Sequence, residues 1–400
     1  MHKLTGKVQH YAWGGTAYIP ALLGIENTVQ QPYAEYWLGA HSSNPSIVQW
    51  KENKGIALNE LIKEAAREWL GEKAAAQFGE LPYLFKVLDV KDMLSIQVHP
   101  SKAEAEKGFA RENEAGIPLN APHRNYKDAN HKPEVMLALS EFWLLHGFKE
   151  KNLLLQTLQQ TEAFKILLPA FEKEGYYGLY KQVMELPQAT VDGMLKPLLH
   201  KSMPLYKANQ LSKSNPAYWA CKTIASHSGN YTDIDRGIFS IYFFNIVQLH
   251  PGQGIFQGAG LPHAYLEGQN IELMSNSDNV LRGGLTPKHI DVPELLKHTL
   301  FEGIVPQIMH GEKNGVETIY HCPVPDFEVS KIELDKKAMY HHTASSAEIL
   351  LVTEGEADIA WDGQTLHIKK GEAVIAGANE LYNISSGSQA VLYKAGVATR

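Results

Sequence analysis

The chain of 400 residues contains only two cysteines, Cys221 and Cys322, which lie far apart in the sequence. Two distant cysteines cannot form a disulfide scaffold, and without a C-x-x-C pair there is no cysteine-rich zinc module. The sequence does contain 18 histidines. Any metal site should therefore be built from nitrogen and oxygen ligands.

An excess of basic residues is also missing. The chain has 37 Lys and Arg against 44 Asp and Glu, which gives a net charge of −7. Binding to nucleic acid depends on a basic field spread over a face or groove. We therefore expect no nucleic-acid partner, and an anionic small molecule would have to be held by a local cluster of cations.

No long hydrophobic run is present. The most apolar stretch, 237–247, is interrupted by Ser240 and Asn245 and is too short to cross a bilayer. The first seven residues, Met-His-Lys-Leu-Thr-Gly-Lys, lack the apolar region of a signal peptide. These features predict a cytoplasmic protein without membrane contact.

What is present is the composition of a globular protein, with 44% hydrophobic and 20% charged residues. At roughly 150 residues per domain, the length predicts two or three domains. Apolar residues at helical spacing predict a helix over 56–70, ended by Gly71. The alternation of apolar and polar residues over 94–99 predicts a strand.

The rest of the chain divides by its periodicity into a helical segment and later β segments. Residues 151–235 have the spacing of helices, whereas residues 238–249 are aromatic and β-branched and predict a strand. Short strands separated by glycine turns recur over 320–400, and Asp362-Gly363 is a good hairpin signal. Two β regions flanking a helical insertion are expected, the last of them a small sandwich or barrel.

Three rows of polar residues could form a catalytic or binding site. The first row lies within the strand predicted over 94–99. There Ser95, Gln97 and His99 share one face while the apolar residues between them face the other side. A half-exposed strand with a surface histidine is the commoner meaning of such a row. The row therefore gains weight only if other ligands converge on it.

The second row lies in Asp128-Ala-Asn-His-Lys-Pro-Glu134. If residues 130–138 are extended, Lys132 and Glu134 share a face and His131 takes the other. The proline between them favours this, because it disfavours the helical conformation of the residue before it. A surface ion pair is the commoner meaning of Lys-x-Glu.

The third row lies over 261–288, where His263 and Tyr265 share a face and Arg282 follows. Arg282 leads into Gly283-Gly284, where a backbone without side chains would let a substrate approach closely. A lone histidine or arginine usually has a structural role, so the spacing alone leaves the function open.

Taken in order, these rows resemble the type I mannose-6-phosphate isomerases (phosphomannose isomerases), which are zinc enzymes of the cupin superfamily. The resemblance extends over the whole chain, although the helical insertion and the last 80 residues match loosely. Several motifs in a fixed order are far more specific than any one of them. The matching stretches are Val8-Gln-His-Tyr-Ala-Trp-Gly14, Ala34-Glu-Tyr-Trp-Leu-Gly-Ala-His41, Leu94-Ser-Ile-Gln-Val-His-Pro100, Asp128-Ala-Asn-His-Lys-Pro-Glu134, Pro262-His-Ala-Tyr265 and Asp278-Asn-Val-Leu-Arg-Gly-Gly-Leu-Thr-Pro-Lys288.

The resemblance implies a mainly β fold with two cupin-type (jelly-roll) β-barrels and an α-helical domain. The catalytic cupin would comprise residues 1–150 and 236–320, with the helical domain, 151–235, inserted between them. Residues 321–400 would form a degenerate second cupin with a structural role, because they contain no clustered set of metal ligands.

The resemblance also assigns one zinc ion per chain to Gln97, His99, Glu134 and His263. This agrees with the faces inferred above for the first two rows. One carboxylate and three neutral ligands leave a formal charge of +1, and such a site with room for water or substrate is of the catalytic type. The catalytic arginine of the family corresponds to Arg282.

The substrate implied by the resemblance is a small sugar phosphate, mannose 6-phosphate or fructose 6-phosphate, in the carbohydrate metabolism that leads to GDP-mannose. We expect Ser95, His131, Lys132, Tyr265 and Lys288 to line its pocket in a monomeric enzyme. These residues would surround the zinc site on the side open to substrate.

The reaction moves a proton between C1 and C2 through a cis-enediol or enediolate. We expect Lys132 to be the base, because zinc and Arg282 nearby would disfavour its charged form. Arg282 would stabilise the enediolate and Lys288 would hold the phosphate.

Two alternatives remain open on the sequence. A cupin dioxygenase would more often bind iron or copper through several histidines. A non-catalytic sugar-binding cupin would not need Lys132 beside Glu134, and usually carries a DNA-binding module. Metal analysis and oxygen consumption distinguish the dioxygenase from an isomerase. Against the sugar-binding protein, the sequence shows no helix-turn-helix with a basic face.

Overall fold

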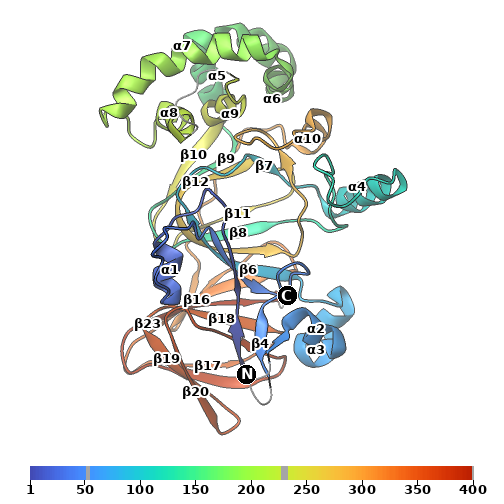
Figure 1. Ribbon diagram of the computed structural model, residues 1–400, viewed down its shortest axis with the longest axis vertical. Coiled ribbons are helices and arrows are strands. Elements are labelled where there is room, and N and C mark those ends of the chain that lie inside the picture. Colours follow the sequence, from blue (N-terminus) through green and yellow to red (C-terminus); the bar gives the residue numbers. More distant parts are fainter. Residues whose placement is uncertain (51–54, 227–232, 399–400) are drawn as a thin grey trace.

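A computed structural model of the chain describes residues 1–50, 55–226 and 233–398. Along its longest axis the helical insertion lies at one end, a ten-stranded sheet lies in the middle, and two sheets lie at the other end (Figure 1). The chain is mainly β with helical regions, as predicted. In the described residues the strand pairings leave each sheet open rather than closed into a hydrogen-bonded barrel.

The ten-stranded sheet is organised by β12, a strand of 13 residues that pairs antiparallel with β6, β7, β8 and β9. A single long strand thus brings together segments from both sides of the helical insertion. The strands are β2 (Lys7–Gln9), β3 (Glu35–Gly39), β6 (Tyr83–Val90), β7 (Gln97–Val98), β8 (Glu134–Ala138), β9 (Phe142–Phe148), β10 (Phe244–Leu249), β11 (Gly254–Gln257), β12 (His263–Ser275) and β13 (Leu281–Arg282).

The other two sheets belong mostly to the last 80 residues, but the nine-stranded one includes β1, which pairs with both β21 and β4. The beginning of the chain is therefore part of the C-terminal sheet. The nine strands are β14 (Glu312–Asn314), β15 (Glu317–Tyr320), β16 (Glu328–Leu334), β23 (Ala390–Gly396), β18 (Glu348–Glu354), β21 (Ala373–Ala376), β1 (His2–Thr5), β4 (Ile47–Gln49) and β5 (Gly55–Ala57). The four-stranded sheet contains β17 (Met339–Thr343), β22 (Leu381–Ser385), β19 (Glu356–Trp361) and β20 (Gln364–Lys369).

The helices lie at the edges of these sheets and in the insertion. The predicted helical character of 151–235 is confirmed for the described part, and residues 227–232 lie outside it. No helix within the described ranges is long and apolar enough to span a membrane. The helices are α1 (Tyr18–Leu23), α2 (Leu58–Glu64), α3 (Ala66–Phe78), α4 (Lys102–Glu114), α5 (Lys151–Gln160), the 3₁₀ helix η2 (Glu162–Leu167), α6 (Leu168–Glu185), α7 (Gln188–Lys207), α8 (Pro216–Ser226), α9 (Gly237–Phe243) and α10 (Val292–His298).

Three local predictions were correct, and one was correct only in its second half. Asp362 and Gly363 form the expected hairpin turn with positive φ angles of 43° and 71°, and β7 includes part of the predicted strand. Gly71 interrupts the helical backbone as predicted, because its φ of 75° and ψ of 166° are not helical, and a second helical stretch follows it within α3. The strand predicted over 238–249 forms only in its second half, as β10. Residues 237–243 form α9 instead, since an apolar run buried on every side carries no period that distinguishes helix from strand.

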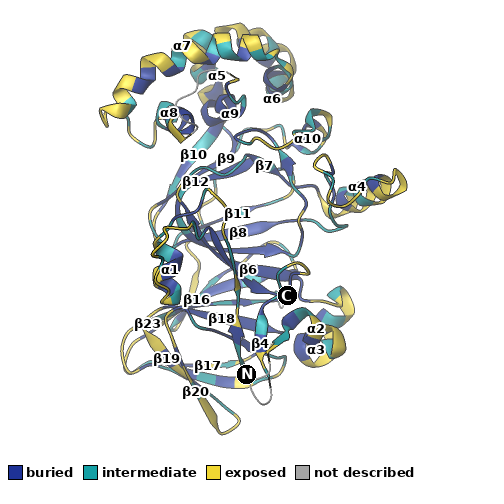
Figure 2. Cartoon of the chain, viewed as in Figure 1, coloured by how far each residue is buried: buried dark blue, intermediate teal, exposed yellow. Residues whose placement is uncertain are grey.

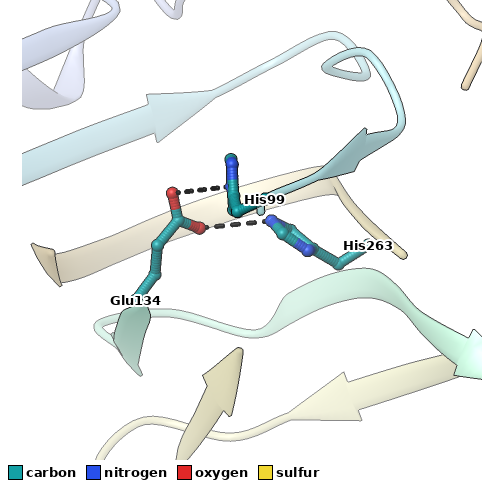
Figure 3. Close-up of side chains that lie close together, drawn as sticks. All are labelled: His99, Glu134 and His263. Atoms are coloured by element: carbon teal, nitrogen blue, oxygen red, sulfur yellow. Dashed lines mark ion pairs between the residues drawn. The ribbon is translucent and has the colours of Figure 1, made fainter. Parts of the chain in front are cut away.

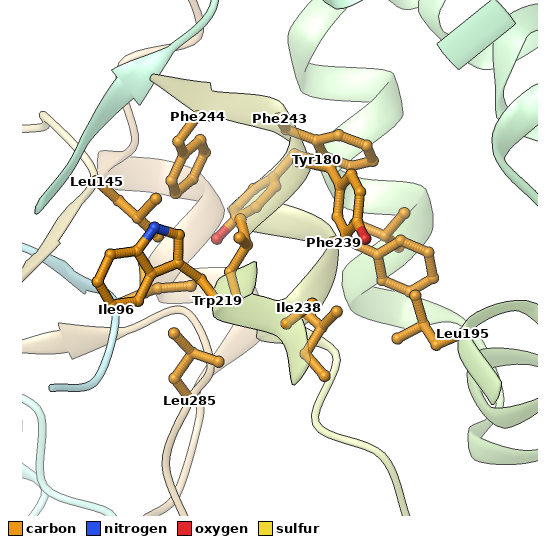
Figure 4. Close-up of a cluster of buried hydrophobic side chains, with 14 of the residues drawn as sticks. Ile96, Leu145, Tyr180, Leu195, Trp219, Ile238, Phe239, Phe243, Phe244 and Leu285 are labelled. Atoms are coloured by element: carbon orange, nitrogen blue, oxygen red, sulfur yellow. The ribbon is translucent and has the colours of Figure 1, made fainter. Parts of the chain in front are cut away.

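The helical insertion covers the back of the ten-stranded sheet. Apolar side chains of β7, β12 and β13, among them Ile96, Val98 and Leu281, share one core with Trp219 and Phe239 from α8 and α9 (Figure 4). In Figure 2 the strands and the inner faces of the helices are buried, while the outer helical faces are exposed. The insertion therefore supports the strands from behind and leaves their polar face to the site.

Candidate metal centre and substrate site

Four neighbouring strands place one polar residue each in a row. His263 of β12 lies directly opposite Gln97 of β7 on one side and His146 of β9 on the other, and Gln97 lies opposite Arg282 of β13. Directly opposed residues of antiparallel strands project to the same face. The register thus brings Arg282, Gln97 and His263 together on the face that the helices do not cover.

The carboxylate of Glu134 lies between two imidazoles on this face (Figure 3). Its Oε1 is 3.3 Å from Nε2 of His99, and its Oε2 is 3.2 Å from Nε2 of His263. The three ligand atoms lie within 4.8 Å of one another, and all three residues are buried. They come from the end of β7 and the first residues of β8 and β12, so three separate segments converge on one point.

The hydrogen bonds of the two imidazoles fit a metal ion. Nδ1 of His99 lies 2.8 Å from the carbonyl oxygen of Asn279, and Nδ1 of His263 lies 2.9 Å from that of Leu261. A carbonyl only accepts, so each Nδ1 carries the proton and a neutral ring presents a lone pair at Nε2.

The charge state of the His99 ring also fits a bound metal ion. Burial lowers the pKa of His99 to about 4 although Glu134 opposes this, so the ring is neutral near pH 7. Nε2 of His99 has no hydrogen-bond partner among the described residues. A lone pair facing a carboxylate oxygen is repulsive unless a cation lies between them, and this donor set is one that Zn²⁺ prefers.

A cavity of about 70 Å³ adjoins two of the three ligands, Glu134 and His263. Gln97, Lys132, Glu134, His263 and Tyr265 line it together. Nζ of Lys132 lies 3.6 Å from Oε1 of Glu134. Five of the predicted site residues therefore share one enclosure, and Gln97 stands beside the metal ligands.

Three charged residues of this cavity were missed in the sequence: Glu35, Lys86 and Glu272. Nζ of Lys86 lies 3.0 Å from Oε2 of Glu272 and 3.6 Å from Oε2 of Glu35, and the Tyr265 hydroxyl donates to Oε1 of Glu272 over 2.8 Å. Burial by itself would lower the pKa of Lys86, but the two carboxylates raise it overall, so the ammonium stays charged. A lysine in the otherwise apolar run 83–88 is the signal that could have found it.

His146 was missed as well. It is buried beside His263, and burial lowers its pKa to about 3. It therefore presents a neutral ring at the edge of the ligand row.

Cations gather around Arg282. Burial lowers the pKa of Lys288, and the positive charge of Arg282 lowers it further. Burial and the charges of Arg124 and Arg282 likewise lower the pKa of Lys127, which lines a neighbouring cavity of about 440 Å³. Cations that repel one another in this way would be stabilised by a bound anion. Lys127 was not predicted, because nothing in its local sequence shows that it faces Arg282.

Three predicted substrate residues, Ser95, His131 and Lys288, are not among the described residues that line the 70 Å³ cavity, and neither is Arg282. Nε2 of His131 is 2.9 Å from Oδ1 of Asp326, so its ring is directed to a carboxylate outside the cavity. Ser95 is half-buried. The expected contact of all four residues with substrate stays a prediction.

Gly283 and Gly284 were predicted to be glycines so that a substrate could approach the backbone, but protein atoms occupy the space beside both residues. A Cβ at Gly283 would lie 2.7 Å from the Tyr180 hydroxyl, and one at Gly284 would lie 2.4 Å from Cα of Gly237. The close approach that requires glycine is therefore made by the helical insertion, which packs against this turn.

Two family models match the chain. Residues 1–151 match the model described as "Phosphomannose isomerase type I, catalytic domain", and residues 317–390 match "Mannose-6-phosphate isomerase, cupin domain". The two matches lie at opposite ends of the chain and flank the helical insertion and the second half of the ten-stranded sheet.

Known proteins are similar over almost the whole length. The mannose-6-phosphate isomerase of Salmonella typhimurium is 38% identical over 97% of this chain and 97% of its own, and that of Homo sapiens is 33% identical over 94% and 93%. A crystal structure of the Salmonella typhimurium enzyme, described as bound to substrate (fructose 6-phosphate) and zinc, covers 99% of both chains with 37% identity and a TM-score of 0.88.

Proposed function

Because the chain belongs to the type I phosphomannose isomerase family, we propose that it is a zinc-dependent mannose-6-phosphate isomerase. It would interconvert D-mannose 6-phosphate and D-fructose 6-phosphate. The observation that carries this proposal is the convergence of His99, Glu134 and His263, from three separate strands, beside a cavity lined by Gln97 and Lys132.

Zinc would be held by Nε2 of His99 and of His263 and by the carboxylate of Glu134, with the amide of Gln97 beside them. When bound, it supplies a Lewis acid that polarises oxygen atoms of the sugar. The backbone carbonyls on each Nδ1 keep both rings in the tautomer that this requires.

The proton transfer would use Lys132. In the cavity it would take the proton from C2 of the open-chain aldose. The electrons of the broken C–H bond would form the C1–C2 double bond while those of the C1 carbonyl move onto O1, which gives a cis-enediolate. The proton of the C2 hydroxyl would pass to O1, and Lys132 would return its proton to C1, which leaves the carbonyl group at C2. The position of Lys132 supports this role, because its side chain lines the cavity and its Nζ lies 3.6 Å from Oε1 of Glu134.

Arg282 would stabilise the oxygen that becomes negative during this transfer. Its register position opposite Gln97 puts it at the end of the ligand row, and a guanidinium donates bidentate hydrogen bonds. Lys288, whose charge is felt by Arg282, would hold the phosphate at the exposed side. This division gives the half-buried cation to the reacting atoms and the exposed one to the phosphate.

A coupled isomerase assay on mannose 6-phosphate tests the proposal. We expect activity that disappears after chelation and returns with one equivalent of zinc, because the ligand group holds a single ion. A folded, zinc-loaded chain without this activity would contradict the proposal. Oxygen consumption with an iron-loaded chain would favour a dioxygenase instead.

The cytoplasmic location, the monomeric state and the place in GDP-mannose formation stay predictions from the sequence.

A further inference from the structure

The end of the helical insertion holds the turn that follows Arg282. Asp235 precedes α9, and its Oδ1 accepts the N–H groups of Gly237 and Leu285 over 2.7 and 2.8 Å. Its Oδ2 accepts the N–H of Thr286 over 2.9 Å. One carboxylate thus joins two segments that are about fifty residues apart.

The turn held by Asp235 is unfavourable by itself. Leu285 has a φ of 55°, in the left-handed region that a residue with a side chain adopts only at a cost in energy. Gly284 has a φ of 124° and packs so closely on Gly237 that a Cβ there would lie 2.4 Å from its Cα. Hydrogen bonds to a carboxylate are about twice as strong as those between neutral groups, so they can hold such a backbone in place.

This turn connects the two cations of the site. Ile96 of the ligand segment exchanges backbone hydrogen bonds with Gly283 and Gly284 over 2.9 and 3.0 Å. The Thr286 hydroxyl then accepts the N–H of Lys288 over 3.1 Å. The residues fixed by Asp235 therefore lie between the strand that presents Arg282 and the loop that presents Lys288.

We infer that Asp235 is a positioning residue of the active site: through the turn 283–286 it sets where Arg282 and Lys288 stand relative to each other. The inference rests on the proposed function, which assigns those two residues to the enediolate and the phosphate. Asp235 touches neither substrate nor metal in this scheme. It acts through three backbone N–H groups.

The test compares Asp235→Asn and Asp235→Ala with the unchanged chain, using mannose 6-phosphate as substrate and inorganic phosphate as competitor. Displacement of a binding group by about an ångström can cost as much as 10²-fold in rate. We expect the alanine variant to raise KM and the inhibition constant of phosphate about tenfold and to lower kcat. The asparagine variant should fall between, because its amide oxygen still accepts two N–H groups but its NH₂ faces Thr286.

A matched control is Asp335→Ala. Asp335 also accepts two backbone N–H groups, from Lys337 and Ala338 over 2.8 and 2.9 Å, but it lies in the C-terminal β region. We expect its KM and phosphate inhibition to equal those of the unchanged chain. Zinc content should stay at one ion per chain in all variants.

The possible outcomes separate the two hypotheses. No isomerase activity in the unchanged, zinc-loaded chain contradicts the proposed function itself. An active chain whose Asp235 variants keep KM and phosphate inhibition within twofold contradicts the positioning role, even if kcat falls through loss of folded enzyme. If the alanine variant does not fold, the isosteric asparagine variant decides by the same two constants.

Discussion

At the scale of single residues, the site depends on which nitrogen of each histidine is already occupied. The backbone carbonyls of Asn279 and Leu261 accept hydrogen bonds from Nδ1–H of His99 and His263. Only the two Nε2 atoms therefore remain as metal ligands. Lys132 stands beside the same carboxylate but offers an amine. Ligand and base roles can therefore be separated by substitution.

Lys132→Met should lower kcat by about 10² to 10⁴-fold, the range for loss of a general base, while zinc content stays at one per chain. Methionine keeps the length of the side chain and removes the amine. Metal analysis and steady-state kinetics on the same preparation provide the measurement. Loss of zinc in this variant would mean that Lys132 supports Glu134 instead of moving a proton.

Lys149 is a half-buried lysine outside the site. Nζ donates to the carbonyl oxygen of Tyr242 over 2.7 Å, and burial lowers its pKa from 10.5 to about 8. The folded chain therefore loses this proton before the unfolded chain does. Below about pH 8 the cost of burying the charge is fully present, and it is relieved as the pH rises from about 8 to 10.5.

Lys149→Met should accordingly stabilise the protein at pH 7, by up to about 3 kcal/mol from a shift of about 2.5 pH units at 1.36 kcal/mol each, less the lost hydrogen bond. The gain in melting temperature over the unchanged chain should shrink toward pH 10. A gain that is the same at pH 7 and pH 10 would show that charge burial is not its cause.

At the scale of elements, β7 is only two residues long and depends on its neighbours. Gln97 lies on the polar face, while Ile96 and Val98 are fully buried in the core shared with the helices. The metal ligands are thus held from behind by apolar packing. The helical insertion contributes to the site through this core although it supplies no metal ligand.

Ile96→Ala should destabilise the protein by about 2–5 kcal/mol, the usual cost of such a cavity, and should also weaken zinc binding, because β7 can then shift. Ile368→Ala, at an equally buried site in the C-terminal core, is the matched control. We expect a comparable loss of stability there with unchanged zinc affinity. If both variants bound zinc as tightly as the unchanged chain, packing of the helical insertion behind β7 would not contribute to zinc affinity.

How well each element could be predicted depended on whether its signal was local. The Asp362-Gly363 hairpin was predicted because two adjacent residues determine the turn. The α9 helix was not, since its seven residues are all buried and carry no polar face. The break at Gly71 was predicted for the same reason as the hairpin, because a glycine at φ 75° and ψ 166° interrupts the helical backbone locally.

At the scale of the molecule, the two β regions differ in the polar group that they enclose: one holds the metal-ligand group, and the other holds a cluster around Lys394. In the C-terminal region Nζ of Lys394 lies 2.9 Å from Oε1 of Glu317, 2.7 Å from the Tyr340 hydroxyl and 3.3 Å from Nε2 of His342. The Glu317 carboxylate and the Tyr340 hydroxyl accept from this ammonium, whereas Nε2 of His342 donates to Oε1 of Glu348 over 2.9 Å. The side chain of Lys394 thus supplies the positive charge that a metal would bring.

The zinc content of the whole chain should therefore be one. His263→Ala should abolish it, whereas His342→Ala should leave it unchanged, because in the described residues His342 belongs to no group that could hold a metal. Metal analysis after dialysis measures both variants. A second bound zinc in the unchanged chain, lost with His342, would contradict this account.

By itself the sequence determined the ligand types, the faces of Gln97 with His99 and of Lys132 with Glu134, and the division into β, helical and β segments. These follow from composition, from the two-residue period of a strand and from motifs within a dozen residues. Only the tertiary structure decided that Lys86 and Glu272 close the cavity and that Asp235 and the helical insertion hold the Arg282 turn. The physical reason is that such contacts are set by strand register and by packing between segments tens to nearly two hundred residues apart, which leave no mark on the neighbouring sequence.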